Sequence, residues 1–495
     1  MQAPPKKWAF VLIATLFIVL SVLFIVRLVY LQVLEHNRFQ QKTNRQVQKK
    51  INIQSFRGHI FDAKGQKLAI SKRAYSLYVS PKRVKHGLLF KHNLNLLAKR
   101  LKISSQTLQK KANSKRVFVW IKRKLSYDDY LACQDMLPSG FYFINEETRY
   151  YPENHLLADV LGFVGTDGGL SGIEYNFDQA LKGSSGQLVI EGDAKGKAFI
   201  TSKRNIKGTP TTLGINVAHN PSLFFNGQNI HLTIDSRLQY VVEKHLKESV
   251  MLYQAQGAQA LVMDSQTGDI LALADYPTFD PNTFYTSDQE SLKNAPLVDI
   301  FEPGSIFKPF IYAIGLEQQF FDPDTSWEIP ETLSIGKHTI RESHKRKEGA
   351  PDHYSTQEII IKSMNVGTTL MAQKIGAPTI HRYLADFGFG KISQYDMPGE
   401  SKGIVRPLSQ VKDIDLATLS FGQGIGVNLA QIAAAYATLA NDGFLVKPNI
   451  IQKTSNQNGS LISKQAKGYQ HKQIISKETA RQVLDTLEKT VSQGS

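Results

Sequence analysis

The sequence predicts an α+β protein behind an N-terminal membrane anchor. Residues 8–26 are apolar except for one Thr and one Ser. Residues 258–263 and 270–274 are apolar segments joined by a six-residue turn with a glycine, which indicates a β-hairpin. We predict a helix before this hairpin, starting after Asp235, and a series of helices after it. A helix, a sheet hairpin and a run of helices together indicate an α+β domain.

The composition excludes several classes of protein. At 495 residues the chain is long enough for two or three domains. Its one cysteine, Cys133, excludes an internal disulfide and a cluster of thiolate metal ligands. No zinc-protease or calcium-loop spacing of His, Asp and Glu occurs, so we expect no metal site.

Charge is distributed unevenly along the chain. Residues 1–124 hold 27 Lys and Arg against 2 acidic residues, and the net charge of the whole chain is +16. Such a basic segment is typical of binding to nucleic acid, a membrane surface or an anionic polymer, and it also fits the solvated face of a lysine-rich domain. Because the anchor argues against nucleic acid, we expect no nucleic-acid partner.

The apolar segment predicts an uncleaved membrane anchor. Nineteen residues of helix span roughly 30 Å, the thickness of the hydrocarbon core of a bilayer. A signal peptide would have a shorter apolar core, and no Ala-x-Ala-like cleavage site follows here. We expect a cytoplasmic tail over 1–7, a transmembrane helix over 8–30 and the rest of the chain outside. Lys6 and Lys7 favour this orientation by the positive-inside rule, although Arg27 at the other end of the helix favours the opposite one.

Residues 31–221 are predicted to form a non-catalytic domain. A basic, helix-like stretch runs from about residue 31 to 50, and the turn Asp62-Ala63-Lys64-Gly65 between apolar segments indicates a hairpin. This region shows no catalytic arrangement of residues, so we interpret it as a spacer and docking module. Turn-forming residues are dense over 208–228, which places the start of a second domain, 222–495, there.

A nucleophile and its base are predicted at the start of a buried helix. Ser305 follows a Pro-Gly turn and precedes the apolar run 311–316. Lys308, three residues on, lies over the same helix face. A serine hydroxyl is a poor nucleophile until a base takes its proton, and a desolvated lysine can act as that base. The spacing alone is a weak signal, because it recurs at Ser334/Lys337 and Ser409/Lys412.

A second motif strengthens this hypothesis. Ser363-Met364-Asn365 is the only Ser-x-Asn in the chain, lies 58 residues after Ser305, and falls inside the helical-looking stretch 359–367. Ser-x-x-Lys followed by such an element and by Lys-Thr-Gly is the signature of penicillin-binding proteins and class A β-lactamases. Two of the three elements are present, and neither Lys-Thr-Gly nor Lys-Ser-Gly occurs in the 495 residues.

A glycine-rich turn over 420–426 precedes a predicted helix over 429–439. Such a turn can hold phosphate, or it can pack a helix tightly against its neighbours. No clear strand precedes the turn and no acidic residue follows at dinucleotide spacing, so packing near the active-site helix is favoured. We therefore expect no cofactor.

With these motifs in place, the sequence resembles a class B penicillin-binding protein, a monofunctional peptidoglycan D,D-transpeptidase, over nearly the whole chain. Phe301-Glu302-Pro303-Gly304-Ser305 is similar to the division (septal) branch. The resemblance implies an elongated α+β pedestal (dimerisation-like) domain followed by a penicillin-binding/serine β-lactamase-like transpeptidase domain. It is further carried by Arg57-Gly58-x-Ile60-x-Asp62-x-x-Gly65, Gly172-Ile173-Glu174, Leu232-Thr233-Ile234-Asp235 and Thr267-Gly268-Asp269.

The resemblance also implies roles for four residues. Ser305 would attack the penultimate D-Ala carbonyl of a D-Ala-D-Ala stem peptide and pass the acyl group to an amine on a neighbouring stem. Lys308 would take the hydroxyl proton, Ser363 would relay it to the leaving amine, and Asn365 would hold the acyl chain. β-Lactams would acylate Ser305 because they mimic D-Ala-D-Ala.

Location and partners follow from the same resemblance. It implies a single-pass protein of the bacterial inner membrane, with its catalytic domain on the periplasmic or extracellular side at the septum. The implied partners are a polytopic membrane glycosyltransferase and other division proteins.

The missing third motif leaves alternatives open. Family members continue into a strand that carries Lys-Thr/Ser-Gly and helps form the oxyanion hole. Loss of one oxyanion donor costs about a hundred- to a thousandfold in rate. We therefore expect the 495 residues to be a truncated enzyme, nearly inactive alone. The alternative is an inactive scaffold or β-lactam sensor with the same fold. A serine β-lactamase is disfavoured by the anchor and the pedestal.

Overall fold

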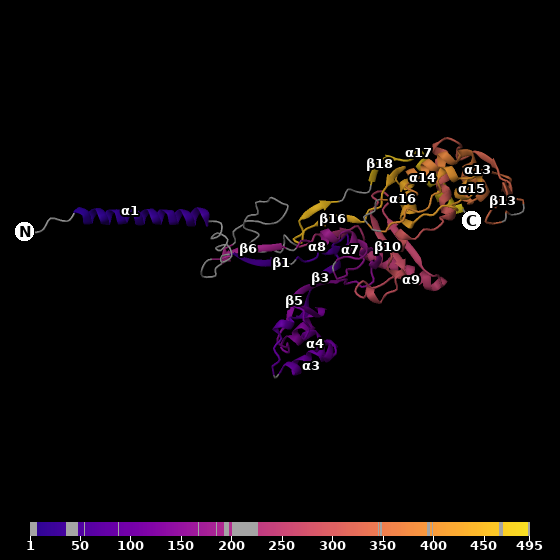
Figure 1. The fold of residues 1–495 in the computed structure, drawn as a ribbon. Helices are drawn as coiled ribbons and strands as arrows, with labels where there is room; N and C mark the ends of the chain where they lie inside the picture. The colour runs from indigo at the N-terminus through magenta and orange to yellow at the C-terminus, as the bar shows by residue number, and fades with distance from the viewer. Residues whose placement is uncertain are drawn as a thin grey trace, which may run out of the picture. The chain divides into compact units, whose positions relative to one another are not determined.

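Figure 1 draws the described chain of the computed structural model as a ribbon. Contacts within the chain divide it into two compact units. Unit 1 comprises Met1–Ser55 and Ser184–Asn226, and unit 2 comprises Phe56–Gly183 and Gly227–Ser495. The described residues are 7–35, 48–53, 55–87, 89–166, 168–184, 186–192, 198–199, 226–344, 346, 349–393, 397, 399–464 and 469–493.

Unit 1 contains the apolar helix and a small sheet. Helix α1 (Lys7–Val29) continues into one π-helical turn, Tyr30–Leu34, and the segment Ala14–Val33 is long and apolar enough to cross a membrane. Strand β1 (Gln48–Ile53) pairs antiparallel with β6 (Gly186–Gly192), which also pairs with β7 (Ala198–Phe199). The prediction of a helix-like stretch up to residue 50 is wrong at its end, because residues 48–50 belong to strand β1, which pairs with the distant β6. Residues 36–47 of that prediction lie outside the described residues.

A seven-stranded sheet runs through unit 2. Its order is β17-β16-β8-β2-β3-β4, and β5 also pairs with β3. Strand β2 pairs parallel with β8, so segments about 170 residues apart lie side by side. The predicted hairpin after β2 is confirmed, because Asp62 Oδ1 accepts the backbone N–H groups of Lys64 and Gln66 before β3 starts. The strands are β2 (Ile60–Phe61), β3 (Lys67–Val79), β4 (Val119–Leu125), β5 (Phe141–Tyr150), β8 (Asn229–Leu232), β16 (Ile451–Ser455) and β17 (Leu461–Lys464).

Two apolar cores lie along this sheet. The first packs three helices of the region 90–134 onto β3, β4 and β5. The second draws side chains from both Phe56–Gly183 and Gly227–Ser495, which joins these segments into one unit. The helices of this region are α3 (Phe90–Leu101), α4 (Ser105–Ala112), α5 (Tyr127–Gln134), α6 (Ala158–Leu161), α7 (Gly172–Asn176) and α8 (Asp178–Lys182).

The predicted helix and hairpin after residue 235 are confirmed. Asp235 caps α9 (Ser236–Tyr253) by accepting the backbone N–H of Arg237. Strands β9 (Ala258–Met263) and β10 (Ile270–Tyr276) form the antiparallel hairpin, and α9 packs against it. Short strands follow in pairs, β11 (Ser326–Glu328) with β14 (His353–Ser355), β12 (Thr332–Ile335) with β13 (His338–Arg341), and β15 (Phe444–Val446) with β18 (Tyr469–Gln473).

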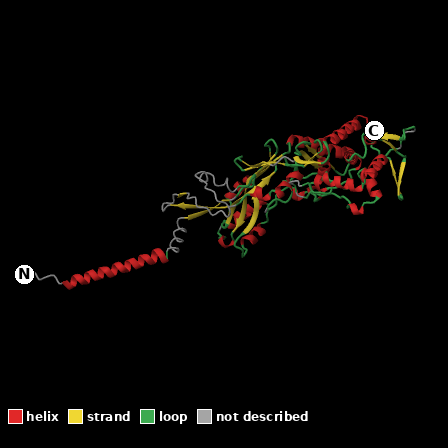
Figure 2. Cartoon of the chain, turned by 90° about the horizontal axis from the view of Figure 1, so that it is seen from above, coloured by secondary structure: helices red, strands yellow, loops and turns green. Residues whose placement is uncertain are grey.

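A largely helical core surrounds one buried helix, α11 (Lys308–Glu317), of which residues 308–316 are all buried. Its apolar faces pack into the largest apolar core of the described residues, and Figure 2 shows the helices of the chain in red. A helix that is apolar on every side is stable only when covered on every side. The surrounding helices are α10 (Ala295–Val298), α12 (Thr356–Ile361), α13 (Asn365–Ile375), α14 (Ala377–Asp386), α15 (Asp413–Ser420), α16 (Leu429–Ala440) and α17 (Lys477–Gln493). The α+β prediction is confirmed.

Candidate active site

Ser305 is exposed at the surface of this core, whereas Lys308 is buried inside it. Ser305 is exposed in a 3₁₀ turn, Gly304–Phe307, that leads directly into α11. Lys308 begins α11 and is only 2 % exposed. The turn therefore presents the hydroxyl to solvent and directs the lysine into the core.

Lys308 meets the second motif directly. Its Nζ donates to the backbone carbonyl of Ser363 at 2.6 Å and to Ser363 Oγ at 3.1 Å. Burial lowers the pKa of Lys308 to about 8, and the Glu342 carboxylate opposes this effect. A lysine with this pKa is partly neutral near neutral pH, as a general base must be. Among the described residues, the structure brings together Lys308 and Ser363 but shows no hydrogen bond from Ser305 to either of them.

The helix predicted over 359–367 is wrong, because it breaks at Ser363. Helix α12 ends at Ile361, and Ser363 has a φ of +52° before α13 begins at Asn365. The N–H of Met364 donates to Ile359 O at 2.9 Å and that of Ser363 to Ile360 O at 3.0 Å. These bonds form a Schellman motif, whose left-handed position is usually glycine. A serine in this conformation is strained, and in the turn its hydroxyl lies 3.1 Å from Lys308 Nζ.

Asn365 lies at the start of α13, and its side chain is turned toward the end of β13. Its Nδ2 donates to the carbonyl of Arg341 at 3.1 Å. A side-chain amide has two N–H groups and a carbonyl oxygen, so this bond uses only part of its capacity.

Comparison with known proteins decides the family. Residues 258–495 match the penicillin binding protein transpeptidase domain, and residues 52–217 match the penicillin-binding protein dimerisation domain. The probable peptidoglycan D,D-transpeptidase PenA of Neisseria meningitidis is 30% identical over 482 residues, which cover 96% of this chain and 77% of the relative. The chain belongs to the class B penicillin-binding proteins.

Other relatives agree with this family. The peptidoglycan D,D-transpeptidase FtsI of Escherichia coli is 28% identical over 455 residues, covering 90% of this chain and 73% of that protein. A peptidoglycan synthetase from Bifidobacterium adolescentis shares the fold with a TM-score of 0.67 at 24% identity, over 90% of this chain and 82% of the other. This penicillin-binding protein is therefore a serine-type D-Ala-D-Ala transpeptidase by resemblance.

The glycine turn of this penicillin-binding protein packs on the nucleophile turn. Gly304 N donates to Gly422 O at 3.0 Å, and Gly424 N donates to Glu302 Oε1 at 2.7 Å. A Cβ on Gly422 would lie 2.1 Å from the Gly304 carbonyl oxygen, so no side chain fits there. Tyr436 of α16 adds a bond from its hydroxyl to the Ile306 carbonyl at 2.6 Å. The packing interpretation is confirmed.

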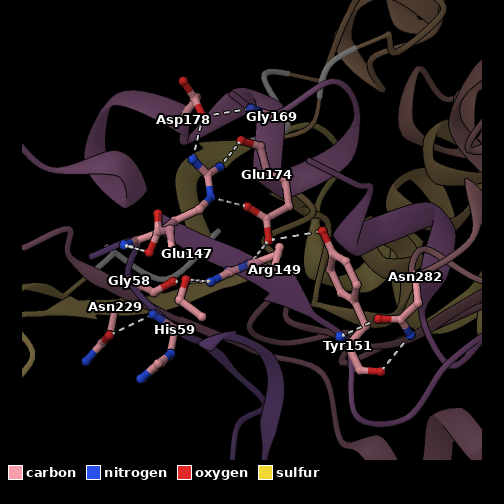
Figure 3. A network of polar contacts seen from close by, with 12 residues as sticks. Gly58, His59, Glu147, Arg149, Tyr151, Gly169, Glu174, Asp178, Asn229 and Asn282 are labelled. Atoms are coloured by element: carbon pink, nitrogen blue, oxygen red, sulfur yellow. Dashed lines mark hydrogen bonds and ion pairs between the residues drawn. The ribbon is translucent and has the colours of Figure 1, made fainter. Parts of the chain in front are cut away.

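The family motifs around Arg57 and Glu174 meet in a buried network (Figure 3). Arg57 Nε donates to Glu174 Oε2 at 2.6 Å, and a second nitrogen pairs with Asp178 at 2.5 Å. Arg149 pairs with the other Glu174 oxygen at 2.5 Å and donates to Gly58 O at 2.6 Å. Arg57 is 4 % exposed and Glu174 is 0 % exposed. Removing one member of such a network is strongly destabilising, because its buried partner loses part of its charge compensation.

Glu342 and Arg341 were missed by sequence reasoning, although both contact the second motif. Glu342 accepts the backbone N–H groups of Asn365 and Val366. The sequence offers only an indirect signal for such acceptors. Met364, at the N-cap of α13, has no side-chain oxygen that can cap a helix, so the cap must come from another part of the chain.

Proposed function

We propose that this transpeptidase cross-links peptidoglycan stem peptides at the division septum through an acyl-enzyme on Ser305, and that β-lactams inhibit it there. One observation carries the proposal. Lys308 is buried three residues after the exposed Ser305, and its Nζ contacts both the carbonyl oxygen and the hydroxyl oxygen of Ser363. A nucleophile, a base with a pKa near 8 and a hydroxyl relay are three of the groups that acyl transfer uses.

In the first half-reaction, neutral Lys308 takes the proton of Ser305, whose oxygen attacks the penultimate D-Ala carbonyl. Ser363 passes a proton from the Lys308 ammonium to the nitrogen of the terminal D-Ala. The peptide bond breaks, D-Ala leaves, and an ester to Ser305 remains. Asn365 holds the acyl chain by its amide.

In the second half-reaction, an amine from a neighbouring stem attacks the ester. Its proton passes back through Ser363 and Lys308 to Ser305 Oγ, and a new peptide bond forms. No metal or cofactor is needed in either half, because the base, relay and nucleophile are side chains. A β-lactam would follow the first half-reaction, with its ring amide in place of the D-Ala-D-Ala bond.

The membrane placement is part of the proposal. The N-terminal apolar helix fits a single-pass anchor. We propose that the catalytic part lies on the periplasmic or extracellular side and that a polytopic glycosyltransferase and other division proteins are partners. We also propose a pedestal over 31–221 and a transpeptidase domain over 222–495. The septal assignment is supported by the Phe-Glu-Pro-Gly-Ser sequence before the nucleophile.

Labelling with a fluorescent penicillin tests the chemistry. Membranes containing the protein expressed from its native gene should label, and Ser305→Ala should remove the label without changing the protein level. The exposed Ser343→Ala serves as a matched serine control and should label normally. No label on the native protein would argue for the inactive scaffold, and label on Ser305→Ala would show that another residue is acylated and would reject the proposed role of Ser305. A fluorescent fusion that fails to gather at septa would reject the division role.

A further inference from the structure

The start of helix α13 has no cap of its own. Met364 occupies the N-cap position and makes no side-chain hydrogen bond. The first N–H groups of a helix need outside acceptors, because no carbonyl precedes them in the helix. Glu342 supplies both acceptors: one carboxylate oxygen accepts the N–H of Asn365 and the other accepts that of Val366 at 3.0 Å.

The residue before Glu342 contacts the same turn. The Arg341 carbonyl accepts from Asn365 Nδ2 at 3.1 Å. Arg341 ends strand β13, which is tied by its register to β12. Three hydrogen bonds from two consecutive residues therefore hold the start of α13, directly after the strained Ser363. A left-handed serine costs about 1–2 kcal/mol, so its surroundings must hold it in place.

Glu342 also acts on Lys308 by charge. Burial is the first influence on the pKa of Lys308 and lowers it, while the Glu342 carboxylate raises it. The other charged groups of this face are engaged elsewhere or exposed: Glu302 accepts from Gly424, and Arg341 and Lys362 are exposed. A base that must take up and then release a proton works best with a pKa near the working pH.

We propose that Glu342 is a positioning residue for the acyl-transfer reaction, holding the Ser363–Asn365 turn in place and balancing the charge of Lys308. This inference rests on the proposed function, because it assigns Lys308 and Ser363 to proton transfer. Glu342 itself does not touch substrate in this role. It acts through the backbone of α13 and through the electrostatic potential at Lys308 Nζ.

Three variants separate the two effects. Glu342→Gln keeps the size, removes the charge and leaves one backbone N–H without an acceptor. Glu342→Asp keeps the charge but shortens the reach to α13. Glu331→Gln is the matched control, since Glu331 is an exposed carboxylate near the same hairpin. Second-order rates of acylation by a fluorescent penicillin are measured against pH for the natively expressed protein, together with the melting temperature of each variant.

The wild type and Glu331→Gln should reach half of their maximal rate near pH 8. Glu342→Gln should reach its own half-maximum at a lower pH, because removing the anion favours neutral Lys308, and its maximum should fall about ten- to a hundredfold. Glu342→Asp should keep the midpoint of the wild type with a reduced maximum.

A Glu342→Gln profile that keeps the wild-type midpoint would overturn the inference, even with a lower melting temperature, because a purely structural cap would give that result. An unchanged maximum in both variants would overturn it as well. Persistent labelling of Ser305→Ala would instead reject the proposed function.

Discussion

The left-handed backbone of Ser363 predicts an unusual order of stability among its variants. An L-residue in this conformation costs about 1–2 kcal/mol, and glycine avoids that cost. At ordinary helix positions glycine is less stable than alanine by about 0.5–1 kcal/mol. At 363 the order should reverse, with Ser363→Gly more stable than Ser363→Ala by about 1 kcal/mol. Both variants lose the 3.1 Å contact of the hydroxyl with Lys308 and keep the 2.6 Å contact of the carbonyl, so their difference isolates the backbone.

Thermal denaturation of the two variants measures this difference. A change of 1 kcal/mol shifts the melting temperature by about 2–4 °C in a domain of 150–250 residues, and by somewhat less in a larger one. We expect the glycine variant to melt about 1–2 °C above the alanine variant. Equal stability, or a more stable alanine variant, would refute the strained geometry. Penicillin acylation should fall to a similar extent in both, and full acylation in either would show that the hydroxyl is dispensable.

Three further predictions concern packing and charge. Arg57→Ala should lower the free energy of unfolding by about 3–5 kcal/mol in urea denaturation, because it removes one of the two arginines that pair with buried Glu174 and the arginine partner of Asp178. The exposed Arg73→Ala should change it by less than about 0.5 kcal/mol. Gly422→Ala should reduce both penicillin acylation and melting temperature far more than Gly459→Ala, which has a similar positive φ but open space around it. The pKa of Lys308 falls from the ordinary 10.5 to about 8 on folding, so the native state binds fewer protons than the unfolded chain between these values. The free energy of unfolding of the wild type should therefore rise between pH 8 and 10.5 by up to about 3 kcal/mol more than that of Lys308→Met. If both proteins gain stability equally with pH, the lowered pKa of Lys308 is contradicted.

Features determined by short segments were predictable from the sequence. The uninterrupted apolar run at the N-terminus gives α1. The cap at Asp235 starts α9 where expected, and the apolar strands on either side of Gly268 form the predicted hairpin. The burial of Lys308 followed from its place in an apolar helix. In each case the residues that decide the structure lie within a few positions of it.

Features determined by distant pairing were not predictable. The apolar pattern over 359–367 continues through Ser363, so the neighbouring residues do not predict the break between α12 and α13. The acceptors that let α13 start anew come from Glu342, more than twenty residues earlier in the chain. The motifs around Arg57 and Glu174 were recognisable, but only the fold shows that residues 117 positions apart form an ion pair.

The active site therefore combines a strained backbone at Ser363 with hydrogen bonds that hold this strained turn in place. Glycine would relieve the left-handed strain at position 363, yet it would lose the hydroxyl that accepts a hydrogen bond from Lys308 Nζ. Relays of this kind need fixed geometry, because a displacement of about 1 Å can cost a hundredfold in rate. A strained turn supplies that geometry only while its neighbours prevent relaxation, which is the part played by the hydrogen bonds from Glu342 and Arg341. Weakening those bonds should consequently lower the rate of acylation before it unfolds the core, because α11 and the surrounding helices are stabilised separately by apolar packing.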